Sequence, residues 1–228
     1  MTKTAAAKMT NRPIPTEARE AIGSCGRILG ALFLTYPREP AFQLLREQLE
    51  QLPSLADWPF GTEDELRVAH ALMQEGLTET DAANAANATD TGLAREYQRL
   101  FIGPHHFKAP AWGSVYLDKD QVLFGTSLLE LRQWMRENDI VVNQEKREPE
   151  DHIGRMLVLM GWLATEKPEG LHTYLAEHLM PWVPRYLQVL RADARQPFYE
   201  GLAVLTQSTL EGIVENLGVR VSKKKLYV

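Results

Sequence analysis

Apolar residues recur at spacings of three and four along most of the chain, which is the period of one face of an α-helix. Such a pattern runs from Thr16 to Tyr36, and Pro37 ends it. Its members are Ile22, Cys25, Leu29, Leu32, Phe33 and Tyr36. A second helix is predicted to open at Pro40, and a third follows Thr62, which is placed to cap it.

The same period returns in the second half of the chain. Residues 126–135 predict one helix, in which Ser127 and Glu130 have the spacing of a capping box. Another helix is predicted to open within residues 148–152, because Pro149 suits a first helical turn and acidic residues there favour the helix dipole. Each of these helices would place its apolar stripe against a shared core.

Two more helical segments follow towards the C-terminus. Residues 172–195 read as helical with a break near Pro181 and Pro184. A last long helix is predicted to open at Pro197 and to end at Gly218. Because helix follows helix without a convincing pair of strands, we predict an all-α fold, a single-domain helical bundle.

The predicted helical domain covers residues 16–218. Residues 1–15 are expected to form a disordered tail, and residues 219–228 a basic mobile tail. Within the domain, residues 78–92 mix alanine with turn-forming Asn, Asp and Thr, which indicates a soft joint. We therefore expect a monomer, with a domain-swapped dimer as the alternative that such a joint would permit.

One loop differs from ordinary surface loops. The stretch Glu96–Leu117 begins as a helical pattern, breaks at Gly103 and Pro104, and continues with two histidines and several aromatic residues. Loops are usually polar because they lie on the surface. An apolar, proline-stiffened loop either packs over the core or forms a groove that packs a partner.

The segment 148–152 concentrates charge, with three acids beside His152. Helix capping is the simplest interpretation. A general acid/base pair of Asp151 and His152 is a second, although neighbours on a helix diverge by about 100°. A third is an anionic lip, formed by Glu148, Glu150 and Asp151, that receives arginines of a peptide. Joined to the aromatic loop, this lip would suit a peptide with an arginine pair and a hydrophobic run.

Composition narrows the classes of function. The 228 residues are 44% hydrophobic and 24% charged, which fits a globular protein with a sizeable core. The net charge of −5 argues against nucleic-acid binding, and no run approaches the ~20 apolar residues of a membrane span. A single cysteine, Cys25, excludes an internal disulfide framework and is expected to be buried. Without a signal-peptide pattern, the expected location is the cytoplasm.

Motifs for catalysis or cofactors are not found. The sequence has no glycine-rich phosphate loop, no HExxH and no zinc-binding cysteine pair. Its six histidines are poorly spaced for a shared metal ion. We therefore predict no catalytic residues, no metal and no cofactor.

Three stretches resemble the TorD/DmsD family of redox-enzyme maturation chaperones, most closely its DmsD branch. They are YQRLFIGP at 97–104, APAWGSVYLD at 109–118 continuing into QVLFG at 121–125, and EPEDH at 148–152. The resemblance covers about residues 20–217 and implies an all-helical chaperone. Such a chaperone would bind the twin-arginine leader of a molybdopterin reductase catalytic subunit and delay its export. Contact with components of the Tat translocase is a further implied partnership.

Carried over by motif, the implied peptide-binding residues are Leu100, Phe101, Gly103, Pro104, Pro110, Trp112, Gly113, Glu148, Pro149, Asp151 and His152. His105 and Tyr116 from the aromatic loop complete the candidate site. The chain departs from close relatives at His105, where tryptophan is frequent, and at Ala111, where a second proline is frequent. Both changes reduce apolar area. Two alternatives to leader binding stay open. The protein could be a chaperone that binds the mature part of a reductase, or a small helical acid/base enzyme.

Overall fold

The computed structural model describes residues 13–51, 55–85, 92–104, 107–141 and 148–228. Within these ranges the helices are α1 (Thr16–Leu34), α2 (Pro40–Gln51), α3 (Glu63–Ala85), α4 (Gly92–Tyr97), η1 (Gln98–Ile102), α5 (Gly113–Leu117), α6 (Thr126–Glu137), α7 (Ile153–Glu166), α8 (Pro168–Thr173), η2 (Tyr174–Leu179), α9 (Val183–Asp193) and α10 (Pro197–Leu217). The segments η1 and η2 are π-helical. The predicted all-α class is confirmed.

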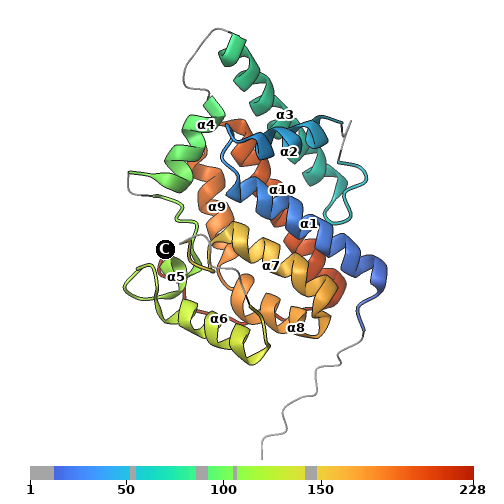
Figure 1. Ribbon diagram of the computed structural model, residues 1–228, viewed down its shortest axis with the longest axis vertical. Coiled ribbons are helices and arrows are strands. Elements are labelled where there is room, and N and C mark those ends of the chain that lie inside the picture. The colour runs from blue at the N-terminus through green and yellow to red at the C-terminus, as the bar shows by residue number, and fades with distance from the viewer. Residues whose placement is uncertain (1–12, 52–54, 86–91, 105–106, 142–147) are drawn as a thin grey trace, which may run out of the picture.

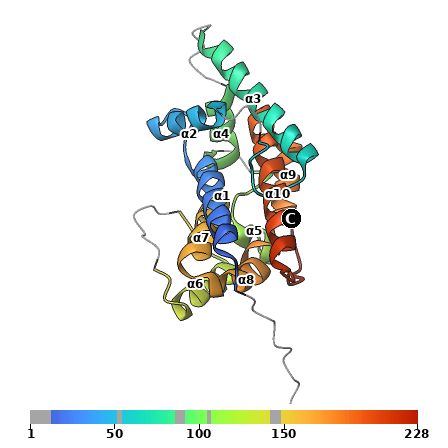
Figure 2. The same ribbon diagram turned by 90° about the vertical axis from the view of Figure 1, so that its right-hand side faces the viewer.

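Two helix pairs that are distant in sequence organise the bundle. Helix α1 packs along α7, and α3 packs along α10 (Figure 1). Viewed from the side, α2 and α3 lie at one end of the molecule and α6 and α8 at the other (Figure 2). In the part of the chain that the structure describes, no helix is long and apolar enough to cross a membrane.

Helices α1 and α7 approach closely because glycines face each other at their contact. A Cβ atom added at Gly26 would lie 2.6 Å from the Leu157 carbonyl oxygen and 2.8 Å from the Gly161 Cα. One added at Gly30 would lie 2.7 Å from the Gly154 oxygen. Larger residues would therefore force the two helices apart.

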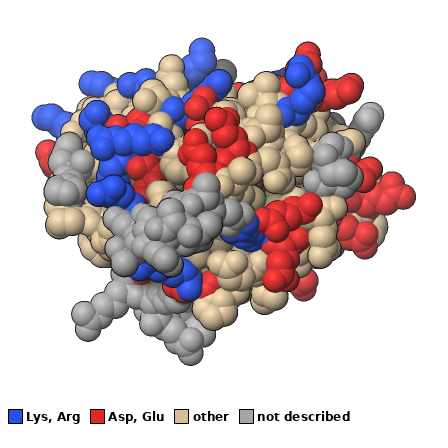
Figure 3. Space-filling view, turned by 90° about the horizontal axis from the view of Figure 1, so that it is seen from above, with Lys and Arg blue, Asp and Glu red and all other residues tan. Residues whose placement is uncertain are grey.

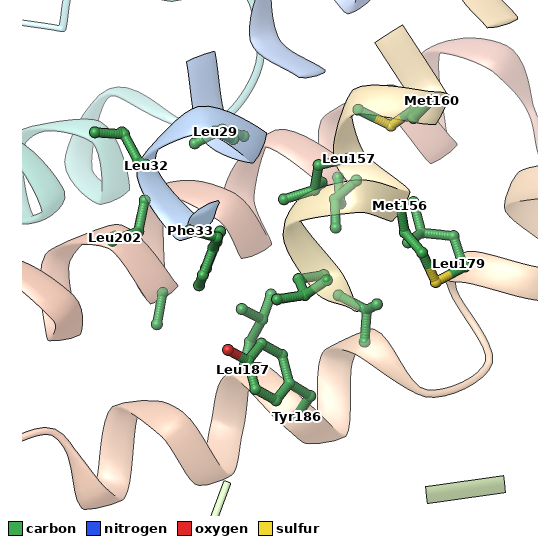
Figure 4. Packing of buried hydrophobic residues seen from close by; sticks show 14 of the residues in the cluster. Leu29, Leu32, Phe33, Met156, Leu157, Met160, Leu179, Tyr186, Leu187 and Leu202 are labelled. Carbon is green, nitrogen blue, oxygen red and sulfur yellow. The ribbon is translucent and has the colours of Figure 1, made fainter. Parts of the chain in front are cut away.

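The core lies between these helices and the C-terminal third of the chain. Leu29 and Phe33 of α1 face Leu157 of α7, with Tyr186 of α9 beside them (Figure 4). Cys25 belongs to the same core, and its burial raises the pKa of its thiol to about 12. The prediction of a buried cysteine is confirmed, and its thiol serves as a small apolar group.

Helix ends agree with the sequence patterns at two places and differ at a third. Thr62 and Glu65 form a capping box, in which each accepts a hydrogen bond from the backbone N–H of the other. Gly218 ends α10 in the left-handed conformation, with φ at +63°. The capping box predicted at Ser127 is wrong, because the Ser127 N–H and hydroxyl both donate to Asp118 instead.

The start of α7 also differs from the prediction. The helix begins at Ile153, so residues 148–152 precede it rather than form its first turn. The reason is a long-range pairing: Trp112 and His152 form an isolated antiparallel β-bridge, and Ile153 donates its N–H to the Ala111 carbonyl at 2.8 Å. The backbone groups needed for an earlier helical turn are engaged in this pairing.

The C-terminal segment is not the free tail that its basic composition predicts. Residues 219–228 lie on the helical domain, where Ser222 donates its N–H to the Ala176 carbonyl at 3.0 Å. Tyr227 donates its N–H to the Tyr116 carbonyl, also at 3.0 Å. Apolar side chains interleaved with the lysines pack against the core, which explains the docking. Of the predicted N-terminal tail, residues 1–12 lie outside the described residues.

Candidate functional site

The segment that leaves α4 changes direction at a π-helical turn. In η1, Leu100 and Phe101 are buried, whereas Ile102 points outwards with 54% of its surface exposed. The turn closes at Gly103, whose N–H donates to the Gln98 carbonyl at 2.9 Å. Gly103 has φ at +94°, a conformation that favours glycine. The turn therefore presents Ile102 to solvent while Leu100 and Phe101 anchor it.

The two motifs at 109–118 and 148–152 meet in space. The β-bridge between Trp112 and His152 joins them, and Gly113 donates its N–H to the Asp151 carbonyl at 3.1 Å. The Trp112 indole Nε1 donates to the Glu148 carboxylate at 2.6 Å. Trp112 and Asp151 thus lie on the same side of the molecule, as a single binding site requires.

Asp151 has a structural role at this junction. Its side chain is 3% exposed, and its Oδ2 accepts a hydrogen bond from the Ser114 N–H at 2.7 Å, near the start of α5. Burial raises the pKa of Asp151, and the hydrogen bonds from Ser114 oppose this shift. A carboxylate held in this way is not available as part of an exposed anionic lip.

His152 caps α7. Its Nδ1 accepts a hydrogen bond from the Gly154 N–H at 3.2 Å, and burial lowers its pKa to about 3. The imidazole is therefore neutral at physiological pH. Because Asp151 and His152 each cap a different helix, this geometry gives no support to an acid/base pair.

The negative charge of Glu150 is compensated by an arginine. Arg132 of α6 donates to its Oε2 through both Nε and Nη2, at 2.8 and 2.6 Å. The Glu150 side chain is buried, so the arginine offsets a charge that would otherwise be costly to desolvate. Of the three acids expected to form the lip, Glu148 alone keeps a half-buried carboxylate without an arginine bonded to it in the structure as described.

A groove of about 850 Å³ opens beside these residues. We call it the α1–α7 groove; it is lined by Leu34, Tyr36, Glu39, Tyr97, Phe101, Ile102, Met135, Ile140, Val141, Glu148, Glu150, His152, Arg155, Val158, Leu159 and Trp162. Trp162 of α7 is 38% exposed, and Val158 lies one turn before it. The groove combines exposed apolar side chains with carboxylates, which is the combination expected for the predicted ligand.

The predicted site residues divide into two groups around this groove. Phe101, Glu148 and His152 line it, and Glu150, their predicted neighbour, does so as well. Trp112 is buried beside it and fixes Glu148 through its indole. The described structure thus places part of the predicted site on one surface.

The remaining predicted residues lie elsewhere. Tyr116 is fully buried against Trp182, with ring centroids 5.5 Å apart. Gly113 lies against the same Trp182 ring, and Pro149 is buried. Pro110 is half-buried. His105 lies outside the described residues.

A second cavity of about 920 Å³, whose lining includes more charged residues, holds three of the predicted residues, Leu100, Gly103 and Pro104. Arg99 lines this cavity and forms ion pairs with Glu96 at 2.7 Å and with Asp193 at 2.5 Å.

Basic side chains gather on one side of the face seen in Figure 3, and acidic ones occupy its centre and opposite side. Among the described residues no cluster of three or more His, Cys, Asp or Glu could hold a metal ion.

Sequence reasoning missed several residues that line the groove. Tyr36 and Glu39 come from the turn between α1 and α2, and Val158 and Trp162 come from α7. The last two had a recognisable signal, because apolar residues four positions apart lie outside the inward stripe of α7. Glu39 had none, since a lone acid before a helix is common.

A family model and several known proteins match this chain in sequence. Residues 62–188 match the model of the family described as nitrate reductase delta subunit. The Tat proofreading chaperone DmsD of Salmonella typhi is 38% identical over 92% of this chain and 97% of its own length. The chaperone protein TorD of Ferrimonas balearica is 32% identical over 50% of this chain and 54% of its own length. A crystal structure from Archaeoglobus fulgidus, of a protein proposed to mature redox enzymes, shares 19% identity over 89% of this chain and 99% of its own, with a TM-score of 0.47.

Proposed function

Because the chain belongs to the nitrate reductase delta subunit family, the TorD/DmsD chaperones, we propose that it binds the twin-arginine leader of a molybdopterin reductase catalytic subunit. Held in this way in the cytoplasm, the subunit is delayed from export through the Tat pathway until it has folded and received its cofactor. The relative from Salmonella typhi carries the name of a Tat proofreading chaperone. The chaperone acts by binding and does no chemistry on its client.

The observation that carries the proposal is the α1–α7 groove. A twin-arginine leader contains cationic residues followed by a hydrophobic run, so it needs carboxylates beside an apolar surface. The groove offers Ile102, Val158 and Trp162 on the apolar side and Glu148 on the acidic side. Burial of apolar surface contributes about 25 cal/mol per Å² before ordering costs are subtracted. The apolar wall therefore provides most of the affinity, and the acids set the orientation.

The proposal predicts that groove variants lose the leader while the fold is kept. Ile102→Ser and Trp162→Ala should each weaken binding of a synthetic twin-arginine leader about tenfold, since each removes exposed apolar surface worth roughly 1–2 kcal/mol. Isothermal titration calorimetry measures the affinity, and circular dichroism checks the helical content. Leu129→Ala, on an exposed residue of α6 outside the groove, is the matched control and should bind normally.

Unchanged affinity in both groove variants would overturn the location of the site. A separate experiment tests the alternative, in which the chaperone binds the mature part of the reductase. When the chaperone is purified together with a reductase subunit, deletion of the leader should abolish recovery of the complex. Recovery that does not depend on the leader would favour the mature part as the segment that is held.

A further inference from the structure

The charged residues of the α1–α7 groove are not equivalent. Four lie along it: Glu39, Glu148, Glu150 and Arg155. Glu150 accepts two hydrogen bonds from Arg132, which lies outside the groove lining, so its charge is already compensated. Arg155 donates to the backbone carbonyl of Glu148 and so holds the main chain beside that carboxylate. Glu39 and Glu148 remain as the carboxylates that a cationic ligand can approach.

Glu39 is held at the groove by the turn between α1 and α2. Its N–H donates to the Tyr36 carbonyl at 2.8 Å, and its own carbonyl accepts the N–H of Phe42 at 2.9 Å as α2 begins. The ring of Tyr36 packs edge-on against Tyr97, with centroids 5.6 Å apart. The turn is thereby fixed against the segment that leads into η1, while the Glu39 side chain stays exposed.

Glu148 reaches the groove from a separate part of the chain. Its Oε1 is occupied by the Trp112 indole at 2.6 Å, which fixes the carboxyl group and leaves Oε2 for a further donor. Both glutamates line the groove together with Tyr97. Burial raises the pKa of Tyr97, and the charges of Glu39 and Glu148 raise it further. Two acids from distant segments of the chain therefore line the groove together with the same tyrosine.

We propose that Glu39 and Glu148 each receive one of the two consecutive arginines of the leader. The inference rests on the proposed function and adds Glu39 to the recognition site. Consecutive side chains point to opposite faces of an extended peptide and diverge by about 100° on a helix. Two adjacent arginines therefore suit two carboxylates on separate segments better than one carboxylate that would draw like charges together.

The geometry also accounts for a preference for arginine. A guanidinium presents several donors in a planar fork, so it can bond one oxygen of a fixed carboxylate and still donate to a neighbouring acceptor. The ammonium group of lysine is a compact charge that lacks this fork. Because Trp112 holds Glu148 in one orientation, the site should distinguish the two cations.

The test is a set of double-mutant cycles between protein and peptide. The protein variants are Glu39→Gln and Glu148→Gln, which keep side-chain size and, at Glu148, an oxygen that can accept from Trp112. The peptides are a twin-arginine leader and two versions in which either the first or the second arginine is replaced by glutamine. Glu20→Gln removes the same charge from an exposed position of α1 outside the groove and is the control.

Each groove variant should bind the intact leader roughly threefold to tenfold more weakly, in keeping with a partly exposed ion pair. That loss should vanish for one singly substituted peptide and persist for the other, with the two variants responding to different arginines. Glu20→Gln should show no change.

Two results would overturn the inference. One is a Glu39→Gln variant that couples to neither arginine, and the other is coupling of both variants to the same arginine. Either result leaves the proposed function standing if Trp162→Ala still weakens leader binding about tenfold. Conversely, failure of every groove variant to affect binding would refute the groove itself.

Discussion

His152 shows how a single buried side chain links this fold to pH. Burial keeps the pKa of its imidazole at about 3, whereas a histidine in an unfolded chain titrates near 6.5. As the pH falls below about 6.5, the unfolded chain takes up a proton that the folded chain does not accept until about pH 3. The free energy of unfolding must therefore decrease on acidification through this interval.

We expect a contribution from His152 of about 1.4 kcal/mol per pH unit between pH 6 and 4. Urea denaturation at several pH values measures it. His152→Asn keeps a side chain that can cap α7 and does not titrate, so its stability should depend less steeply on pH. His178, whose pKa is lowered to about 4, is present in both proteins and cancels in the comparison. If the free energy of unfolding depended on pH equally steeply in the two proteins, His152 would not be a buried, neutral imidazole.

The sequence pointed to the motif residues but not to their individual roles. One interpretation of the acidic cluster at 148–152 presents Glu150 and Asp151 to a ligand, but the structure buries both. Their partners are Arg132 and Ser114, and Ser114 is 37 positions from the aspartate it bonds. Spacing along a chain identifies which residues could act together, but it cannot show which of them is already satisfied by a distant donor.

At the scale of elements, the contact between α1 and α7 depends on the absence of side chains. Gly26→Ala should lower stability by roughly 1–3 kcal/mol, because its new methyl group would meet the backbone of α7 at 2.6 to 2.8 Å. Helix propensity alone predicts the opposite sign, a gain of up to about 1 kcal/mol. Chemical denaturation distinguishes these expectations.

The matched control for this substitution is Gly170→Ala. Gly170 lies in α8, where the nearest atom to an added Cβ is a ring carbon of Trp134 at 3.5 Å, an ordinary contact distance. This variant should be as stable as the parent protein or slightly more stable. If Gly26→Ala were equally well tolerated, the close approach of α1 and α7 would not be needed for stability.

Element prediction succeeded where the signal was local. The helix cap at Thr62 and the glycine stop at Gly218 depend only on neighbouring residues, and both are confirmed. It failed where tertiary partners decide the outcome. Ser127 bonds Asp118 rather than its own helix, and the pairing of Trp112 with His152 delays the start of α7.

At the scale of the whole molecule, the C-terminal segment joins elements that are remote in sequence. Its backbone bonds Ala176 of η2 and Tyr116 of α5, and Arg185 of α9 donates to the Val228 carbonyl at 3.1 Å. A chain that stops after Gly218 should lose on the order of 2–4 kcal/mol, mainly from exposed apolar surface. A fall in the thermal midpoint of several degrees would be measured by calorimetry.

A second variant separates the effect of the packed C-terminal segment on stability from the effect of its lysine charges. Lys223→Ala combined with Lys225→Ala removes two exposed charges but keeps the backbone and apolar contacts of the segment. This double variant should change stability by less than about 0.5 kcal/mol. Full stability of the shortened chain would show that the segment contributes little, as its basic composition first suggested.

The burial of Cys25 has a practical consequence for studying this chaperone in complex with a client. A thiol with its pKa near 12, enclosed in the core, does not react with maleimides under mild conditions. A second cysteine at Val141, on the rim of the α1–α7 groove, would then be the only site to take a fluorophore or spin label. The native sequence therefore allows a reporter to be attached beside the α1–α7 groove without first removing a residue from the core.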